Sequence, residues 1–170
     1  MDIKIRPATI EDRQALWQVH TQAIRQDAVS HYDAAQIEAW AGRLVADYYT
    51  PDPDVFIVAE ADSAGVVGFC EISIEAAEIQ AVFVAPEYGR RGIGRRLLQA
   101  LEDIAVRHNL THLVLDASLN AVTFYERMGY RQKEPTIQRY GEGAVTVPGM
   151  LMTKNLLDAE PTGDANGNCS

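Results

Sequence analysis

The sequence predicts one mixed α/β domain, in which helices cover both faces of a mixed β-sheet. Apolar residues recur at helical spacing in two places, residues 16–24 and residues 93–105. β-rich runs separated by short breaks fill residues 55–84, and two more close the chain at 131–155. With 170 residues, the chain has the length of a single domain with a short tail.

The N-terminal third predicts one strand and two helices. Residues 3–6 alternate between apolar and charged side chains, as in a short strand. Thr9 is expected to cap the helix that contains residues 16–24, because its hydroxyl can accept a bond from a free backbone N–H. A second helix is expected over residues 33–48, and the Pro- and Asp-rich residues 50–54 are expected to form a loop.

The middle of the chain changes to β character and then returns to a helix. Three runs joined by short connections predict an antiparallel meander, and they lie at residues 55–60, 66–75 and 78–84. A strongly amphipathic helix is expected from Gly92 to about Asn109. A short apolar strand is expected to follow it.

The C-terminal third predicts a strand, a short helix and a closing hairpin. The short strand covers residues 112–115, and the helix runs from Ser118 or Asn120 to Met128, with Gly129 as its C-cap. The hairpin strands are expected at 131–140 and 145–155. The domain therefore spans residues 1–157, and the polar, acidic residues 158–170 are expected to be a solvated tail.

Charge and composition exclude several classes of protein. Fifteen basic and 24 acidic residues give a net charge of −9, which disfavours nucleic-acid binding and favours cationic partners. No apolar run approaches membrane-spanning length, and the charged N-terminal residues do not resemble a signal peptide, so a cytoplasmic protein without membrane contact is expected. Cys70, Cys169 and the four histidines show neither a disulfide framework nor metal spacing, so no metal is expected.

A glycine- and arginine-rich turn carries the chemistry. The segment Gly89-Arg90-Arg91-Gly92-Ile93-Gly94-Arg95-Arg96 follows a strand and opens a helix. The first turn of a helix has free N–H donors and partial positive charge, and glycines let a ligand approach the backbone closely. A diphosphate is the natural ligand. The segment lacks the lysine and hydroxyl residue of a P-loop, and Leu97 occupies the third small-residue position of a Rossmann fingerprint.

Three connected segments resemble the GNAT (Gcn5-related N-acetyltransferase) superfamily. They are the strand ending Val82-Phe83-Val84-Ala85-Pro86-Glu87-Tyr88, the turn around Gly92-Ile93-Gly94, and Asn120-Ala121-Val122-Thr123-Phe124-Tyr125-Glu126-Arg127-Met128-Gly129-Tyr130. The resemblance covers about residues 3–156. It implies a sheet of about seven strands that is split between the fourth and fifth strands, with acetyl-CoA inserted in the split.

The resemblance implies a site for the acetyl donor. The family pattern Q/R-x-x-G-x-G/A has Gly89 in its first position here, and Arg90 stands one place later. Backbone N–H groups of Gly92, Ile93 and Gly94 would hold the diphosphate, and backbone groups of Val82 and Val84 would pair with the pantetheine arm. The remaining donor contacts that the resemblance implies are Phe83, Arg90, Arg91, Arg95, Phe124 and Asn120; Asn120 is either a helix cap alone or also a contact of CoA.

The resemblance also implies two proton carriers. Glu78 lies where some relatives carry the general base, and a chain of water molecules is the competing route. Tyr125 matches the acid that protonates the departing thiolate, and the alternative is an aromatic packing role beside Phe124. Candidates for the acceptor pocket, by position only, are His31, Tyr32, Trp40, Glu71 and Arg139, whereas His20 is expected to pack at the core edge.

The predicted function is transfer of an acetyl group from acetyl-CoA to a primary amine, by direct attack in a ternary complex. The acceptor is a small molecule or a peptide, and a homodimer is compatible with the resemblance. Two alternatives stay open at this point. One is a non-catalytic acyl-CoA-binding or sensor module, and the other is a partner-binding domain that uses the arginine cluster.

Overall fold

The computed structural model describes residues 2–42, 45–52 and 55–157. Its seven strands form one mixed sheet in the order β1-β2-β3-β4-β5-β7-β6, in which only the β4/β5 pair is parallel. The strands are β1 (Ile3–Pro7), β2 (Phe56–Ala61), β3 (Gly65–Ser73), β4 (Glu78–Val84), β5 (His112–Ser118), β6 (Arg131–Tyr140) and β7 (Val145–Asn155). The predicted fold class, a seven-stranded mixed sheet with helices, is confirmed.

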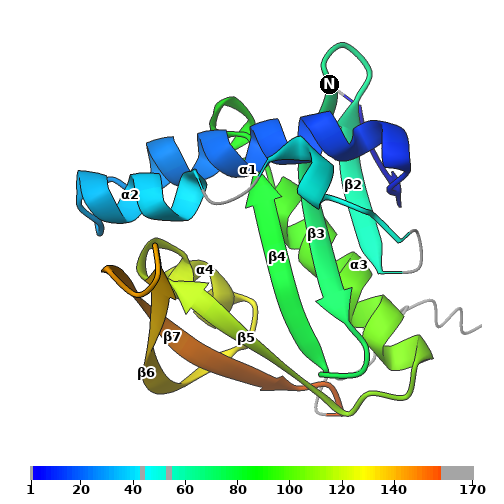
Figure 1. The fold of residues 1–170 in the computed structure, drawn as a ribbon. Coiled ribbons are helices and arrows are strands. Elements are labelled where there is room, and N and C mark those ends of the chain that lie inside the picture. Colours follow the sequence, from blue (N-terminus) through cyan, green and yellow to red (C-terminus); the bar gives the residue numbers. More distant parts are fainter. Residues whose placement is uncertain (1, 43–44, 53–54, 158–170) are drawn as a thin grey trace, which may run out of the picture.

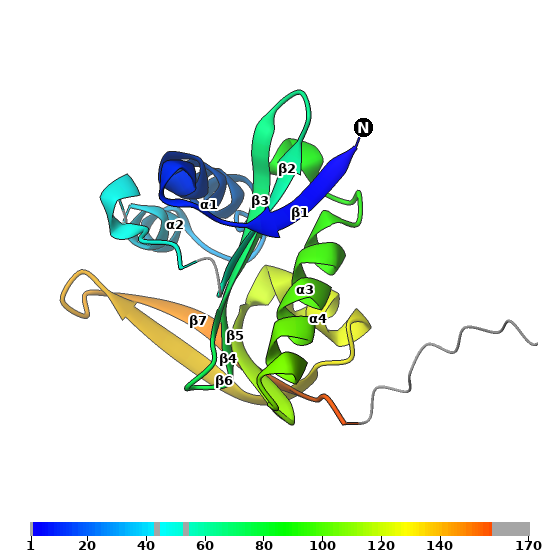
Figure 2. The ribbon, with the colours of Figure 1, turned by 90° about the vertical axis from the view of Figure 1, so that its right-hand side faces the viewer.

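Helices cover both faces of this sheet. Helices α1 (Arg13–Asp27) and α2 (Ala34–Ala41) lie on one face, and α3 (Ile93–Arg107) and α4 (Val122–Arg127) lie on the other (Figure 2). The amphipathic pattern of α3 explains its place, since its apolar side chains Leu97, Leu98 and Leu101 are completely buried against the sheet. Arg96 of the same helix donates a hydrogen bond of 2.8 Å to the carbonyl of Ile3 in β1.

The sheet is split between its fourth and fifth strands, as the resemblance to the GNAT superfamily implies. β4 and β5 pair in register only at Glu78 with Val114 and at Ile79 with Leu115. Beyond these two pairs the strands diverge in a V, while β3 follows β4 along its whole length (Figure 1). Residues 80–84 of β4 therefore have one edge without a strand partner. An unpaired strand edge inside a sheet exposes N–H and C=O groups that another extended chain can satisfy.

The structure differs from the sequence expectations at several element ends. The helix predicted over residues 33–48 ends at Ala41, because Gly42 caps it, and Val45 beyond it is 64% exposed rather than packed. β5 continues to Ser118 instead of stopping at Leu115, because its polar residues pair with β7. Thr9 caps a 3₁₀ turn, Ile10–Asp12, which leads into α1. The helix predicted from residue 118 begins with a 3₁₀ turn, Leu119–Ala121.

Burial agrees with the expected core. Cys70 is completely buried beside α3, with its thiol 3.4 Å from the carbonyl of Leu97. No helix among the described residues has the length and apolar character needed to cross a membrane. The predicted tail, residues 158–170, and Pro53-Asp54 of the predicted loop lie outside the described residues.

Candidate active site

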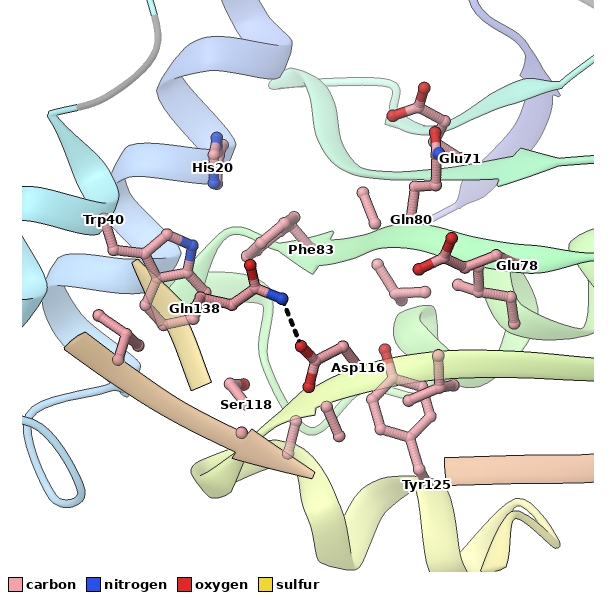
Figure 3. Close-up of a pocket in the computed structure, with 18 of the residues that line it drawn as sticks. His20, Trp40, Glu71, Glu78, Gln80, Phe83, Asp116, Ser118, Tyr125 and Gln138 are labelled. Atoms are coloured by element: carbon pink, nitrogen blue, oxygen red, sulfur yellow. Dashed lines mark hydrogen bonds between the residues drawn. The ribbon is translucent and has the colours of Figure 1, made fainter. Parts of the chain in front are cut away.

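A cavity of about 380 Å³ lies where β4 and β5 diverge. β4 supplies one wall with every residue from Glu78 to Phe83, and β5 supplies the opposite wall with Leu115 to Ser118. Helices α1 and α2 close one side, and Tyr125 of α4 closes another (Figure 3). The cavity is therefore a direct consequence of the split sheet, because the missing ladder between the two strands leaves room for an extended ligand.

Tyr125 points from α4 toward this cavity (Figure 3). The residue is 7% exposed and packs edge-on against Phe124 and Tyr130, with ring centroids 5.0 and 5.7 Å away. No hydrogen bond joins its hydroxyl to another described residue. Burial, with a smaller contribution from nearby Cys70, raises the pKa of the phenol, so Tyr125 keeps its proton well into the alkaline range. A buried phenol without a partner, facing a cavity, is available to donate to a ligand.

Two glutamates line the β3/β4 side of the cavity. Glu78 begins β4, and Glu71 of β3 pairs in register with Ala81. The register between β3 and β4 shifts here, since Glu71 faces Ala81 while Ile72 faces Ile79, which leaves Gln80 as the extra residue of a β-bulge. The bulge lies at the point where the β4 edge becomes free. Burial raises the pKa of the Glu71 carboxyl to about 7.

Aromatic side chains form the side of the cavity near α1 and α2. Tyr32 donates to the carbonyl of Pro148 at 2.7 Å and accepts from the N–H of Leu119 at 2.8 Å, so it ties the connection between α1 and α2 to β7. Trp40 packs edge-on against Tyr32 at 5.7 Å. His20 is buried, shares a hydrogen bond with the Tyr49 hydroxyl and packs against the Phe83 ring at 4.5 Å.

Asp116 is a lining residue that the sequence analysis missed. Its two carboxylate oxygens accept hydrogen bonds from Thr136 Oγ1 at 2.5 Å and from Gln138 Nε2 at 2.6 Å, so β6 holds it in place. Figure 3 shows the bond to Gln138 across the cavity. The signal that could have found it is the alternation of the strand, which continues past Leu115 into Asp116 and Ser118.

The arginine and glycine turn lies at the N-terminus of α3. Gly92 is the N-cap, with a left-handed φ of 77°, and Arg90 also has a positive φ of 58°. A Cβ on Gly92 would meet no atom within 4 Å, so the turn is open on that side. A Cβ on Gly94 would lie 3.5 Å from the Phe124 ring and 3.8 Å from Val84, which brings the helix start, α4 and the end of β4 together. Ile93 is buried in the core, so only its backbone is available to a ligand.

Asn120 has the one buried side-chain oxygen or nitrogen without a partner among the described residues, and the atom is Oδ1. A buried carbonyl oxygen without a donor is costly, and such an atom in a native structure usually has a functional partner. Together with the open glycine turn and the free β4 edge, this acceptor fits a ligand that carries phosphates at one end and amide N–H groups along its length. CoA has this chemistry.

The expected site residues fall into two neighbouring groups. Tyr125, Glu78, Val82 and Phe83 line the cavity, together with Tyr32, Trp40 and Glu71 of the acceptor candidates. The turn residues, Val84 and Phe124 lie next to it at the start of α3. His31 and Arg139 are outside the described lining, and the His31 ring bonds to Ser30 instead. Within residues 2–42, 45–52 and 55–157, no group of three or more His, Cys, Asp or Glu residues could hold a metal ion.

Comparisons with known proteins agree with this geometry. Residues 20–151 match the family described as the acetyltransferase (GNAT) domain. The chain is 32% identical over 130 residues to YafP, an uncharacterized N-acetyltransferase of Escherichia coli, with 76% of this chain and 82% of that protein covered. It is 28% identical over 148 residues to a spermidine N(1)-acetyltransferase of Thermoplasma acidophilum, with 79% and 91% covered.

Solved structures show the same fold. A GCN5-related N-acetyltransferase from Rhodopseudomonas palustris superposes with a TM-score of 0.83 at 26% identity, over 91% of this chain and 96% of that one. The PaiA N-acetyltransferase of Thermoplasma acidophilum, solved in complex with coenzyme A, gives a TM-score of 0.71 at 24% identity, over 91% and 99%. The family match covers most of the sequence. The chain therefore belongs to the GNAT family of N-acetyltransferases.

Proposed function

We propose that this protein transfers the acetyl group of acetyl-CoA to a primary amine by direct attack within a ternary complex. The observation that carries the proposal is the cavity at the β4/β5 split, which is lined by a buried, unpaired tyrosine and lies next to the glycine turn of α3. Relatives whose names or structures include spermidine acetylation and bound coenzyme A add support. A neighbour from Salmonella typhimurium was also solved with acetyl-CoA.

In this proposal the donor lies along the open edge of β4. The first-turn amides of α3 and the side chains of Arg90, Arg91 and Arg95 bind the diphosphate, because both present positive charge to it. The backbone of Val82 and Val84 pairs with the pantetheine amides. Phe83 and Phe124 border this path, and Asn120 Oδ1 accepts from an N–H of the donor. The thioester then reaches the part of the cavity that Tyr125 lines.

The chemical step needs three proton transfers, two from the nitrogen and one to the sulfur. The amine must lose a proton before its nitrogen can attack the thioester carbonyl, and Glu78, directly or through water, accepts it in this proposal. The C–N bond forms, the nitrogen of the tetrahedral intermediate gives its second proton to water, and the intermediate collapses as the C–S bond breaks. Tyr125 donates its proton to the departing thiolate and regains one from solvent. The backbone N–H of Val84 or a neighbour would stabilise the oxyanion.

The experiment that tests this function measures two quantities. Calorimetry measures acetyl-CoA binding, and a thiol reagent measures CoA release when a panel of primary amines is added, with the acetylated product confirmed by mass. We expect micromolar binding and amine-dependent release. Binding without turnover on any amine would favour a sensor module, and no binding would favour a partner-binding domain; either result would overturn the proposal.

A further inference from the structure

The residues that line the cavity have an unusual balance of charge. Among the described residues that line the cavity there is no lysine or arginine, whereas three carboxylates line it: Glu71, Glu78 and Asp116. Aromatic rings make up much of the rest. Carboxylates attract cations, and aromatic faces attract them through the ring quadrupole, so this lining favours a cationic ligand over a neutral or anionic one.

The three carboxylates are not equivalent. Asp116 is occupied by its bonds to Thr136 and Gln138. Glu78 is the group that the proposed function places beside the reacting amine. The Glu71 carboxylate has neither a hydrogen bond nor an ion pair with another described residue, although the residue is only partly exposed. A half-buried carboxylate without a partner is unfavourable in its ionised form, and a bound cation removes that penalty.

We propose that Glu71 binds a second positively charged group of the acceptor, so that the preferred acceptors are compact amines that carry two cationic centres. This inference rests on the proposed function, because it assigns the acceptor of that site. Glu71 and Glu78 lie on adjacent strands on the same side of the cavity (Figure 3). One ammonium group can therefore meet Glu71 while the other end of the molecule meets the thioester.

The pKa of the free carboxyl agrees with this role. Burial raises it to about 7, so the side chain is partly protonated at neutral pH when nothing is bound. An ammonium placed against it would favour the ionised form and create a charge-assisted hydrogen bond. A monoamine cannot make this contact once its only nitrogen is at the thioester. The contact should therefore distinguish diamines from monoamines of equal length.

The test compares 1,4-diaminobutane with butylamine at pH 8 and saturating acetyl-CoA. We expect kcat/KM to be at least tenfold higher for the diamine, mainly through a lower KM. Glu71→Gln should remove this preference by raising the diamine KM at least tenfold, whereas kcat/KM for butylamine should fall several-fold less. Glu75 is an exposed residue in the turn after β3, and Glu75→Gln removes the same charge. This control should leave kcat/KM unchanged for both amines.

Three results would overturn the inference. They are equal kcat/KM values for the two amines in the wild type, a preference that survives in Glu71→Gln, or an equal loss for both amines, which would make Glu71 the proton acceptor of the reaction. If neither amine is acetylated, the proposed function fails separately. In that case, calorimetry of diaminobutane binding to the CoA-loaded protein tests the role of Glu71 separately. The wild type should bind diaminobutane, and Glu71→Gln should not.

Discussion

At the scale of single residues, Tyr125 is the clearest case of a side chain whose surroundings suit a chemical role. Its ring packs against Phe124 and Tyr130, but its hydroxyl meets no described partner. The position of Tyr125 is therefore compatible with both alternatives from the sequence, a packing role and acid catalysis. Only acid catalysis requires the hydroxyl, so its removal distinguishes them.

Replacing Tyr125 with phenylalanine keeps the ring and removes only the proton donor. We expect kcat to fall by about 10²–10⁴-fold with little change in KM for acetyl-CoA, because a general acid acts on charge that develops in the transition state. The melting temperature should not fall, since no internal hydrogen bond is lost. Steady-state kinetics and thermal unfolding measure these effects. Full kcat in the variant would make Tyr125 a packing residue, and collapse of acetyl-CoA binding would make the hydroxyl a ligand contact.

Glu71 gives a prediction for stability that does not depend on the acceptor. Its pKa is 4.5 in an exposed reference and about 7 in the folded protein, so between these values the folded state binds more protons than the unfolded state. The free energy of unfolding therefore falls as the pH rises from about 4.5 to 7, and the penalty persists above that range. A shift of this size corresponds to roughly 3 kcal/mol, or about 2 kcal/mol after solvent screening.

Glu71→Gln lacks this titration. Relative to the wild type, it should gain up to about 2 kcal/mol of stability between pH 5 and pH 8. Urea unfolding at several pH values measures the difference, with Glu75→Gln as the control for net charge. If the free energies of unfolding of the wild type and Glu71→Gln change with pH in parallel over this range, the Glu71 carboxyl is not held in the neutral form by burial.

The place of some residues at the cavity could be predicted from the sequence, whereas the surroundings of others depend on tertiary structure. Tyr125 and Glu78 were found because they belong to local segments with a recognisable order, and the structure places both at the cavity. The burial of Glu71 follows from the packing around β3, which no local pattern encodes. Asp116 was missed because a polar residue after an apolar run normally ends a strand.

At the scale of elements, the start of α3 combines a left-handed glycine, free first-turn amides and several arginines. Its sequence pattern was sufficient to predict the helix and its first residue to within one position. The end of α2 was not predictable in the same way. Apolar spacing continued past Gly42, but the glycine cap ended the helix there.

A larger side chain at Gly94 should weaken donor binding. We expect Gly94→Val to lower acetyl-CoA affinity at least about tenfold, or roughly 1.4 kcal/mol, because its branches would crowd the diphosphate path beside Phe124. Gly94→Ala should cost less, since its Cβ has ordinary contact distances. Calorimetry measures both, and far-UV circular dichroism checks the fold. Unchanged affinity in a folded valine variant would contradict the phosphate-binding role of the turn.

Charge at the same helix end should matter more than charge elsewhere on α3. Arg95→Gln is expected to weaken acetyl-CoA binding and reduce its dependence on salt, because one Coulombic contact is lost. Arg107→Gln, in the last turn of the same helix, is the matched control and should leave the affinity unchanged. An equal effect of the two variants would mean that the arginines act through net charge alone.

At the scale of the whole molecule, the split that creates the cavity also weakens the connection between the two halves of the sheet. Only two register pairs join β4 to β5. The connection across the split therefore depends on the helices that cover it. α3 packs against β3 and β4 on one side of the split and is bonded to β7 on the other. The bond to β7 runs from the Lys154 ammonium to both carboxylate oxygens of Glu102, at 2.8 Å each.

Tyr130 strengthens this connection. Its hydroxyl donates to Glu102 at 3.1 Å, and the Lys154 ammonium lies 5.5 Å from the centre of its ring. The two charged side chains are largely buried, with exposures of 18% for Lys154 and 16% for Glu102. Removing one member of such a group leaves the other charge poorly solvated, which costs more than the loss of an exposed ion pair. Glu102 therefore stabilises the arrangement of the two half-sheets around the cavity.

We expect Glu102→Ala to lower the free energy of unfolding by about 2 kcal/mol, because the Lys154 ammonium and the Tyr130 hydroxyl lose their shared acceptor. Urea unfolding measures this loss. Glu38→Ala is the matched control, since it breaks the exposed ion pair between Arg25 and Glu38 at 3.0 Å. Its free energy of unfolding should stay close to that of the wild type. Because α3 begins at the glycine and arginine turn that is proposed to bind the diphosphate, Glu102→Ala should raise the KM for acetyl-CoA as well. A variant as stable as the wild type would mean that packing of the α3 leucines alone holds the halves together.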